Sequence, residues 1–291
     1  MANIAIVYFS GTYHTLQITT FIKNKLLNLH HNVDVFSLNN NLKINIDNYD
    51  YLFLGYPIHA FNMPKGYLKS IKKLKINNKK CLIYKVSGEP FIYNNASSFA
   101  LYRHLKRNNN TFLGEYHFLM PYNILFRTKE NFIRYELEYD LKYMDYMIAS
   151  IDNKQKYHPS LFSKIITLVF KIQRLGCKLN SHFYKVDKEK CIKCRECYLN
   201  CPTQNITYNK EKHRLVFSNK CVMCMRCSFM CPTDAIKIGL LNKKKVNHPY
   251  NIYEILKQDN NYDFSQEKKK FYLKFRPYFN MIDHLDNSKD D

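Results

Sequence analysis

The sequence predicts an α/β protein in which a doubly wound, parallel five-stranded sheet is followed by a small α+β domain. Two observations lead to this prediction. Across residues 1–150, short apolar runs alternate with segments whose apolar residues recur at helical spacing. Across residues 183–240, eight cysteines fall into two matching groups, a pattern typical of a small domain folded around metal clusters.

The first domain begins with the apolar run at 3–9, which is continuous, as in a strand covered on both faces. The later elements alternate, with strands expected at 33–36, 49–55, 81–86 and 111–119 and helices at 16–29, 68–76 and 96–105. Such alternation predicts a parallel sheet. With the strand order 2-1-3-4-5, a ligand belongs outside the carboxyl ends of the strands.

The rest of the chain is expected to be helical up to the second domain, with a connecting helical segment at 151–182. Its apolar and basic residues at 161–172 are typical of a helix that lies on a membrane surface, but we expect a helix packed between the two domains. Residues 241–291 are rich in Lys, Asn and Asp, and we expect a basic, polar, partly ordered tail with one helix at 250–257.

The cysteines of 183–240 form two runs of the pattern C-x-x-C-x-x-C-x-x-x-C-P. This is the run of bacterial two-cluster ferredoxins, in which the fourth cysteine ligates the other cluster. We therefore expect one [4Fe–4S] cluster on Cys191, Cys194, Cys197 and Cys231, and a second on Cys221, Cys224, Cys227 and Cys201. The alternatives are disulfides, buried thiols or zinc, although zinc favours two cysteine pairs. Cys81 and Cys177 are expected to be inert, packed thiols.

The first strand leads into a loop with three hydroxyls, Ser10-Gly11-Thr12-Tyr13-His14-Thr15, at the start of the first helix. Hydroxyls and backbone amides at a strand-to-helix turn suit a phosphate group. Alone, the same residues could serve only as a helix cap.

With these motifs together, the chain resembles the fused flavodoxin–ferredoxin electron-transfer proteins of anaerobic bacteria, also called ferrodoxins. The segments that carry the resemblance lie at 8–12, 55–58, 87–90, 94–98, 120–123 and 201–206. The resemblance implies FMN, with its phosphate on Ser10, Gly11, Thr12, Tyr13, His14 and Thr15. It also implies that loops at 57–62 and 87–95 border the isoalloxazine ring, with contacts from Pro57, Ile58, His59, Ala60, Ser87, Gly88, Glu89 and Asn94.

The phosphate loop departs from the family pattern, which reads Ser-x-Thr-Gly-Asn-Thr. Tyr13 stands where the family has glycine, which restricts the backbone, and His14 stands where it has asparagine. A protonated His14 would favour phosphate. Four aromatic residues of the ring loops could stack on a flavin or pack in the core: Tyr56, Phe61, Phe91 and Tyr93.

The composition indicates where the protein works and which partners it meets. Cysteines used for clusters imply a reducing compartment, and the N-terminal residues lack the charged region of a signal peptide. We expect a cytoplasmic protein with no transmembrane segment. The net charge of +21 is explained most simply by a composition that puts lysine over the whole surface. Alternatively, the charge attracts an acidic redox protein. Nucleic acid is not an expected partner.

The sequence thus predicts an intracellular carrier that passes electrons between two [4Fe–4S] clusters and FMN. One alternative is a flavin-dependent reductase of a small acceptor, such as a quinone or a nitro compound. Another is a ferredoxin with a flavin-free, flavodoxin-like docking scaffold. No nucleophile–base pair, zinc-protease motif or Walker loop is present, so no catalytic residue is predicted.

Overall fold

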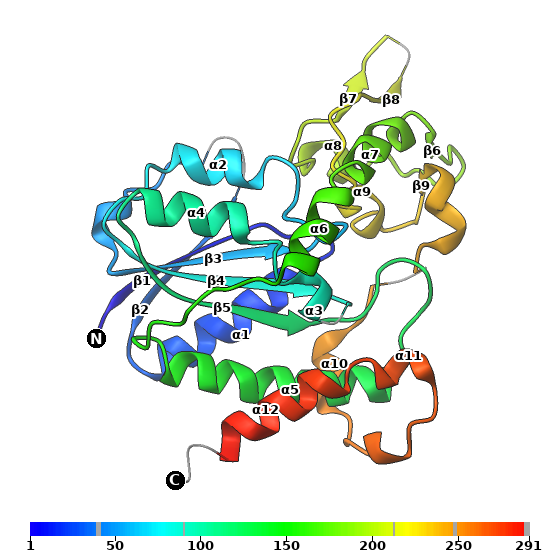
Figure 1. Ribbon diagram of the computed structural model, residues 1–291. Coiled ribbons are helices and arrows are strands. Elements are labelled where there is room, and N and C mark those ends of the chain that lie inside the picture. The colour runs from blue at the N-terminus through cyan, green and yellow to red at the C-terminus, as the bar shows by residue number, and fades with distance from the viewer. Residues whose placement is uncertain (39–41, 90, 212, 247–248, 288–291) are drawn as a thin grey trace.

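The computed structural model describes residues 1–38, 42–89, 91–211, 213–246 and 249–287. A five-stranded sheet forms the centre of the larger part of the molecule (Figure 1). Its strands are β1 (Asn3–Tyr8), β2 (Asn32–Ser37), β3 (Tyr51–Pro57), β4 (Lys80–Ser87) and β5 (Thr111–Leu119). They run parallel in the order β2-β1-β3-β4-β5, so the predicted flavodoxin-like sheet is confirmed.

Helices cover both faces of the sheet, as Figure 1 shows. One face carries α1 (His14–Asn28) and α5 (Glu130–Ala149), and the other carries α2 (Tyr67–Lys73) and α4 (Phe99–Arg107). The short helices α3 (Phe91–Asn94) and η1 (Ile46–Asn48) lie in connections. Because strand side chains alternate between faces, Ile4 and Ile6 enter the core under α1, whereas Ala5 and Val7 enter the opposite core.

The second domain is small and is built from two antiparallel pairs of strands. β6 (Tyr184–Val186) pairs with β9 (Ile236–Ile238), and β7 (Ile206–Asn209) pairs with β8 (Arg214–Phe217), both antiparallel. One-turn helices α8 (Glu196–Leu199) and α9 (Arg226–Phe229) follow the two groups of three cysteines. The core is small and mixes apolar side chains with the cysteines themselves.

The C-terminal segment differs from its prediction as a polar tail. After η2 (Gly239–Lys244), it forms α10 (Ile252–Lys257), η3 (Phe264–Gln266), α11 (Lys270–Leu273) and α12 (Arg276–Asn287). Figure 1 shows α12 running along α5. Phe275, Phe279 and Ile282 recur at helical spacing and are buried in the core under α5. The many Lys, Asn and Asp residues of this segment obscured the helical spacing of its apolar residues, so the prediction of a polar tail was wrong. The helix expected at 250–257 is confirmed as α10.

The connecting segment contains α6 (Leu161–Val169) and α7 (Gln173–Ser181). α6 packs beside α3 of the first domain, with Ser163 buried and five apolar residues exposed: Leu161, Phe162, Ile165, Leu168 and Val169. A helix packed between the two domains was expected here; α6 contacts the first domain, and the exposure of its apolar residues was not foreseen. Among the residues that the structure describes, no helix is both long and apolar enough to span a membrane.

Candidate functional site

The eight cysteines of the second domain gather into two groups. Burial, and then the charges of Cys194, Cys231 and Cys191, raise the pKa of Cys197 to about 11, which places these four thiols near one another. Burial also raises the pKa of Cys224 to about 12, and the charges of Cys221 and Cys201 add to the shift. The fourth cysteine of each run is thus near enough to the other run for its charge to act there, whereas the crossed ligation itself stays a prediction.

The loops around the cysteines repeat each other in detail. The amide of Asn205 lies 3.2 Å from the sulfur of Cys201, and the amide of Ala235 lies 3.2 Å from the sulfur of Cys231. Amide donors to sulfur stabilise thiolates and adjust the potential of a cluster. Three residues of each run have positive φ at matching positions, namely Lys193, Arg195 and Gln204 in the first and Met223, Met225 and Asp234 in the second.

No three His, Cys, Asp or Glu side chains in the described residues converge closely enough to bind one metal ion. A cubane does not need such convergence, because it presents a separate iron atom to each of its four thiolates. The donor set of four thiolates in each group fits that cofactor.

The predicted phosphate loop joins β1 to α1, with Ser10, His14 and Thr15 buried. Tyr13 has φ of 71°, in the left-handed region that glycine favours, and its side chain is 38% exposed. The loop therefore takes a glycine-like turn in spite of the tyrosine. Burial lowers the pKa of His14 to about 4, so this ring is neutral at pH 7 and offers a hydrogen bond without a charge.

Buried polar groups in this loop fit a phosphate. The hydroxyl of Thr15 is buried and has no hydrogen-bond partner among the described residues. The hydroxyl of Thr12 accepts from Asn123 Nδ2 at 2.8 Å, which brings the loop after β5 against the phosphate loop. The N-terminus of α1 adds a positive end of a helix dipole at the same place.

The other predicted residues follow the carboxyl ends of β3 and β4. Pro57 ends β3, and Ile58, His59 and Ala60 follow it. Ser87 ends β4, and its hydroxyl lies 2.7 Å from His117 Nε2 and 3.3 Å from Asn94 Nδ2. Gly88 and Glu89 come next; Glu89 bonds to Tyr122 and to Lys274 of the C-terminal segment.

The helix α6 lies over both of these loops. The ring of Phe61 packs on Phe170 with centroids 4.7 Å apart, and Tyr93 lies 6.3 Å from Phe162. Asn62 Nδ2 donates to the carbonyl of Thr167 at 3.0 Å. Tyr56 is instead a core residue that bonds to Ser98, and the side chain of Phe91 falls outside the described residues.

The second cysteine group lies directly against the phosphate loop. A Cβ placed on Gly11 would be 2.1 Å from the carbonyl oxygen of Cys224. The guanidinium of Arg226 donates to the carbonyl of Ser10, and Cys224 also packs against the core that contains Val7. The two candidate cofactor sites are therefore neighbours, although they belong to different domains.

Sequence reasoning missed a buried ionic network under the loop after β4. Lys85 Nζ pairs with Glu115 and donates to the carbonyl of Asn94 at 2.9 Å. Burial, and then the charge of Lys85, hold the pKa of His117 well below its usual value, so His117 meets Ser87 as a neutral ring. The signal in the sequence was a lysine and a glutamate inside otherwise apolar strands.

A second missed residue is Tyr184, whose buried hydroxyl lies beside the second cysteine group. Burial and the charges of Cys221 and Cys227 raise its pKa. No spacing rule marks this tyrosine, because it comes from β6, which precedes the first of the two cysteine runs.

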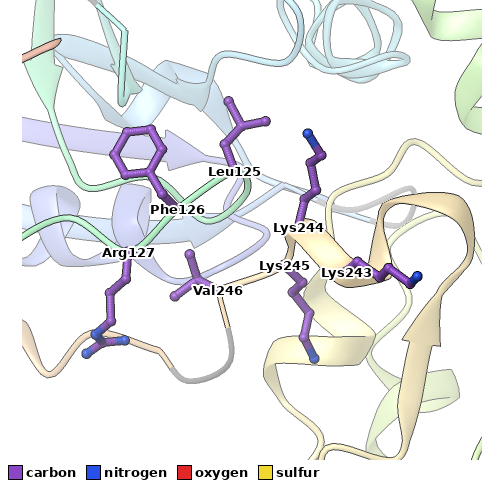
Figure 2. A pocket seen from close by; sticks show the side chains of 7 residues that line it. All are labelled: Leu125, Phe126, Arg127, Lys243, Lys244, Lys245 and Val246. Carbon is purple, nitrogen blue, oxygen red and sulfur yellow. The ribbon is translucent and has the colours of Figure 1, made fainter.

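A cavity of about 500 Å³ opens where the C-terminal segment meets the loop after β5. Its lining includes Arg127 and three consecutive lysines, and Figure 2 shows that these charged side chains point away from one another. The backbone of Leu125 donates to the carbonyl of Lys244 at 2.6 Å, which joins the two segments. No predicted cofactor residue lines this cavity, and its charges do not converge on a ligand.

Known proteins are similar to the two parts of the chain separately. Residues 184–238 match the family of the 4Fe-4S dicluster domain. No curated protein sequence matches the chain. Three solved flavodoxins are similar in structure: a mutant from Fusobacterium nucleatum bound to flavin mononucleotide (18% identity, 38% of this chain, 68% of that chain, TM-score 0.33), one from the domain Archaea (12%, 56%, 98%, 0.35) and the two-electron reduced protein of Megasphaera elsdenii (18%, 40%, 85%, 0.34).

The assignment of the first domain rests on its strand order and not on these scores. Five parallel strands in the order 2-1-3-4-5, with helices on both faces, form a flavodoxin-like fold. Residues 184–238 match the model of the 4Fe-4S dicluster domain, and the chain as a whole has the architecture of a fused flavodoxin–ferredoxin protein.

Proposed function

We propose that this protein passes electrons between two [4Fe–4S] clusters and an FMN. The observation that carries the proposal is the contact between Gly11, in the predicted phosphate loop, and Cys224, in the second cysteine group. Redox centres exchange electrons when the protein fixes them close together, and this contact brings the two sites to one interface. The proposed cluster ligands are the two crossed sets, Cys191, Cys194, Cys197 and Cys231, and Cys221, Cys224, Cys227 and Cys201.

FMN would bind with its phosphate on residues 10–15. The unpartnered hydroxyl of Thr15 and the N-terminus of α1 support this placement. The loops that contain Pro57, Ile58, His59, Ala60, Ser87, Gly88, Glu89 and Asn94 would border the ring. When bound, a flavin allows one-electron and two-electron steps to be joined. The chain itself would supply neutral hydrogen bonds from His14 and the hydroxyls, and α6 would screen the ring loops from water.

Cluster thiolates favour a reducing, cytoplasmic location, and a redox protein is the natural exchange partner. The net charge of +21 would favour an acidic one. We propose that 183–240 is the cluster domain and that 241–291 completes the domain formed by 1–150.

One observation favours a second candidate, a ferredoxin with a flavin-free scaffold. Phe61 and Tyr93, on the ring loops, already pack against α6 through Phe170 and Phe162. These contacts take the place of the stacking that a flavin would receive.

Anaerobic purification, with iron, sulfide and FMN quantified per chain, tests both candidates. Two cubanes require about eight irons per chain. Saturation near four irons would remove the two-cluster assignment. Full iron content without FMN, and no flavin fluorescence quenching when FMN is titrated into the protein, would select the flavin-free scaffold.

A further inference from the structure

The helix α6 presents its apolar side to solvent. Six residues at helical spacing, each 51–73% exposed, form this stripe: Leu161, Phe162, Ile165, Leu168, Val169 and Ile172. The opposite side faces the protein and includes polar residues: Ser163 is fully buried, and the hydroxyl of Thr167 donates to the carbonyl of Phe61 at 3.2 Å. Phe170, just after the helix, packs on Phe61 at the same contact. A surface helix normally buries its apolar stripe against the core, so this orientation is inverted.

The chain around the stripe carries one sign of charge. Between Asp152 and Asp187 the sequence has no acidic residue, and its basic residues there are Lys154, Lys156, Lys164, Lys171, Arg174, Lys178 and Lys185. Lys171 is exposed in the turn that follows α6, whereas Lys164 is half-buried, with its Nζ 5.0 Å from the centre of the Phe99 ring. An outward apolar stripe bordered by lysines is typical of helices that lie in the interface of anionic membranes.

We propose that α6 docks this protein on an anionic bilayer, with the stripe buried among the acyl chains and the flanking lysines at the headgroups. A second copy of the chain fits this surface poorly, because the two stripes would bring together segments that are both basic. The stripe also lacks the Trp, Tyr and Arg residues that anchor most protein interfaces.

Docking would place the cofactor loops beside the lipid. The same helix that carries the stripe bonds to Phe61 and Asn62, in the loop after β3. This consequence rests on the proposed function, whereas the docking itself does not.

The chain contains no tryptophan, so Ile165→Trp introduces a single fluorescent reporter in the stripe. The full-length holoprotein with this change is mixed with vesicles of phosphatidylcholine alone or of phosphatidylcholine with phosphatidylglycerol. We expect a blue shift of the tryptophan emission with the anionic vesicles only, reduced by high salt. Leu29→Trp, at an exposed site at the end of α1, is the matched control and should not shift.

Flotation of the vesicles measures binding directly. Leu168→Asp with Ile172→Asp should lower the bound fraction at least tenfold, whereas Leu27→Asp with Leu29→Asp, also at exposed leucines, should not. Replacing Lys164, Lys171 and Lys178 by Gln should weaken binding more than replacing Lys69, Lys72 and Lys73 of α2. Iron content and visible absorption, unchanged from wild type, show that each variant is folded.

Several results would overturn the proposal. One is the absence of binding to either vesicle. Another is an equal loss of binding in Leu168→Asp/Ile172→Asp and in the control Leu27→Asp/Leu29→Asp. Full binding by Leu168→Asp/Ile172→Asp would count in the same way, because the vesicles would then attract a basic protein non-specifically. A third is a concentration-dependent dimer in analytical ultracentrifugation that the stripe variant abolishes while vesicle binding is absent, which would assign the surface to a second copy.

Discussion

At the scale of single residues, Gly11 matters because the two domains approach each other at its α-carbon. Alanine there would place a methyl group 2.1 Å from the carbonyl of Cys224, so the loop or the domain must move. We expect Gly11→Ala to lower the free energy of unfolding by about 1–3 kcal/mol, a range typical of overpacked sites, and to weaken FMN binding.

The matched control for this change is Gly176→Ala. No described atom lies within 4 Å of a Cβ at Gly176, which is in α7, so alanine should be neutral or slightly stabilising there. Anaerobic thermal denaturation, followed by cluster absorption, compares the two variants. Equal stability of Gly11→Ala and Gly176→Ala would show that the domains do not meet at Gly11.

His14 makes stability depend on pH. Burial lowers its pKa from 6.5 to about 4, so the unfolded chain takes up a proton at a higher pH than the folded protein does. The stability that the neutral ring contributes is complete above pH 6.5 and is lost as the pH falls toward 4. At pH 5 the linked loss is about 2 kcal/mol.

His14→Asn isolates this effect, because asparagine has no proton to gain. The difference in melting temperature between wild type and variant should be constant above pH 7 and should move in favour of the variant between pH 6.5 and pH 4.5. A difference that does not change with pH would mean that position 14 is open to solvent.

At the scale of elements, the strands could be predicted because each is a short apolar run, and the two cysteine runs could be predicted because cluster ligation fixes their spacing. α6 shows the limit of such patterns. Its periodicity defines an apolar stripe, but periodicity does not say whether the stripe faces the core or the solvent. Likewise, the contact between Gly11 and Cys224 joins residues far apart in the chain, so no local pattern could indicate it.

The C-terminal helix α12 should be essential to the first domain. The ring of Phe279 is buried against Tyr135 and Tyr139 of α5, and Tyr278 donates to Asp140 at 2.6 Å. We expect Phe279→Ala to cost about 3–5 kcal/mol, as for other buried aromatic residues. Leu240→Ala, at a site 74% exposed, is the control and should change the melting temperature little. If Phe279→Ala and Leu240→Ala both have the melting temperature of wild type, residues 241–291 do not stabilise the first domain.

At the scale of the whole molecule, the cofactor sites are in a fixed order. The second cysteine group adjoins the phosphate loop through Cys224, and its Cys227 is near enough to Cys197 for the charge of one thiolate to raise the pKa of the other. The two groups are therefore neighbours, and Cys224 of the second group is the cysteine that the structure shows against the phosphate loop. In the proposed carrier, electrons would pass between the flavin and the first cluster by way of the second.

Two cysteine variants test this order, because crossed ligation makes their effects the reverse of what chain position suggests. Cys201 stands in the first run but belongs to the second group, so Cys201→Ala should remove the cluster beside the flavin. Cys231→Ala should remove the distant cluster and leave the near one. After photoreduction of bound FMN, the remaining cluster should bleach rapidly in Cys231→Ala and slowly or not at all in Cys201→Ala. Rapid bleaching in Cys201→Ala alone would reverse the assignment of the clusters, and equally rapid bleaching in both would mean that the flavin is close to the two clusters alike.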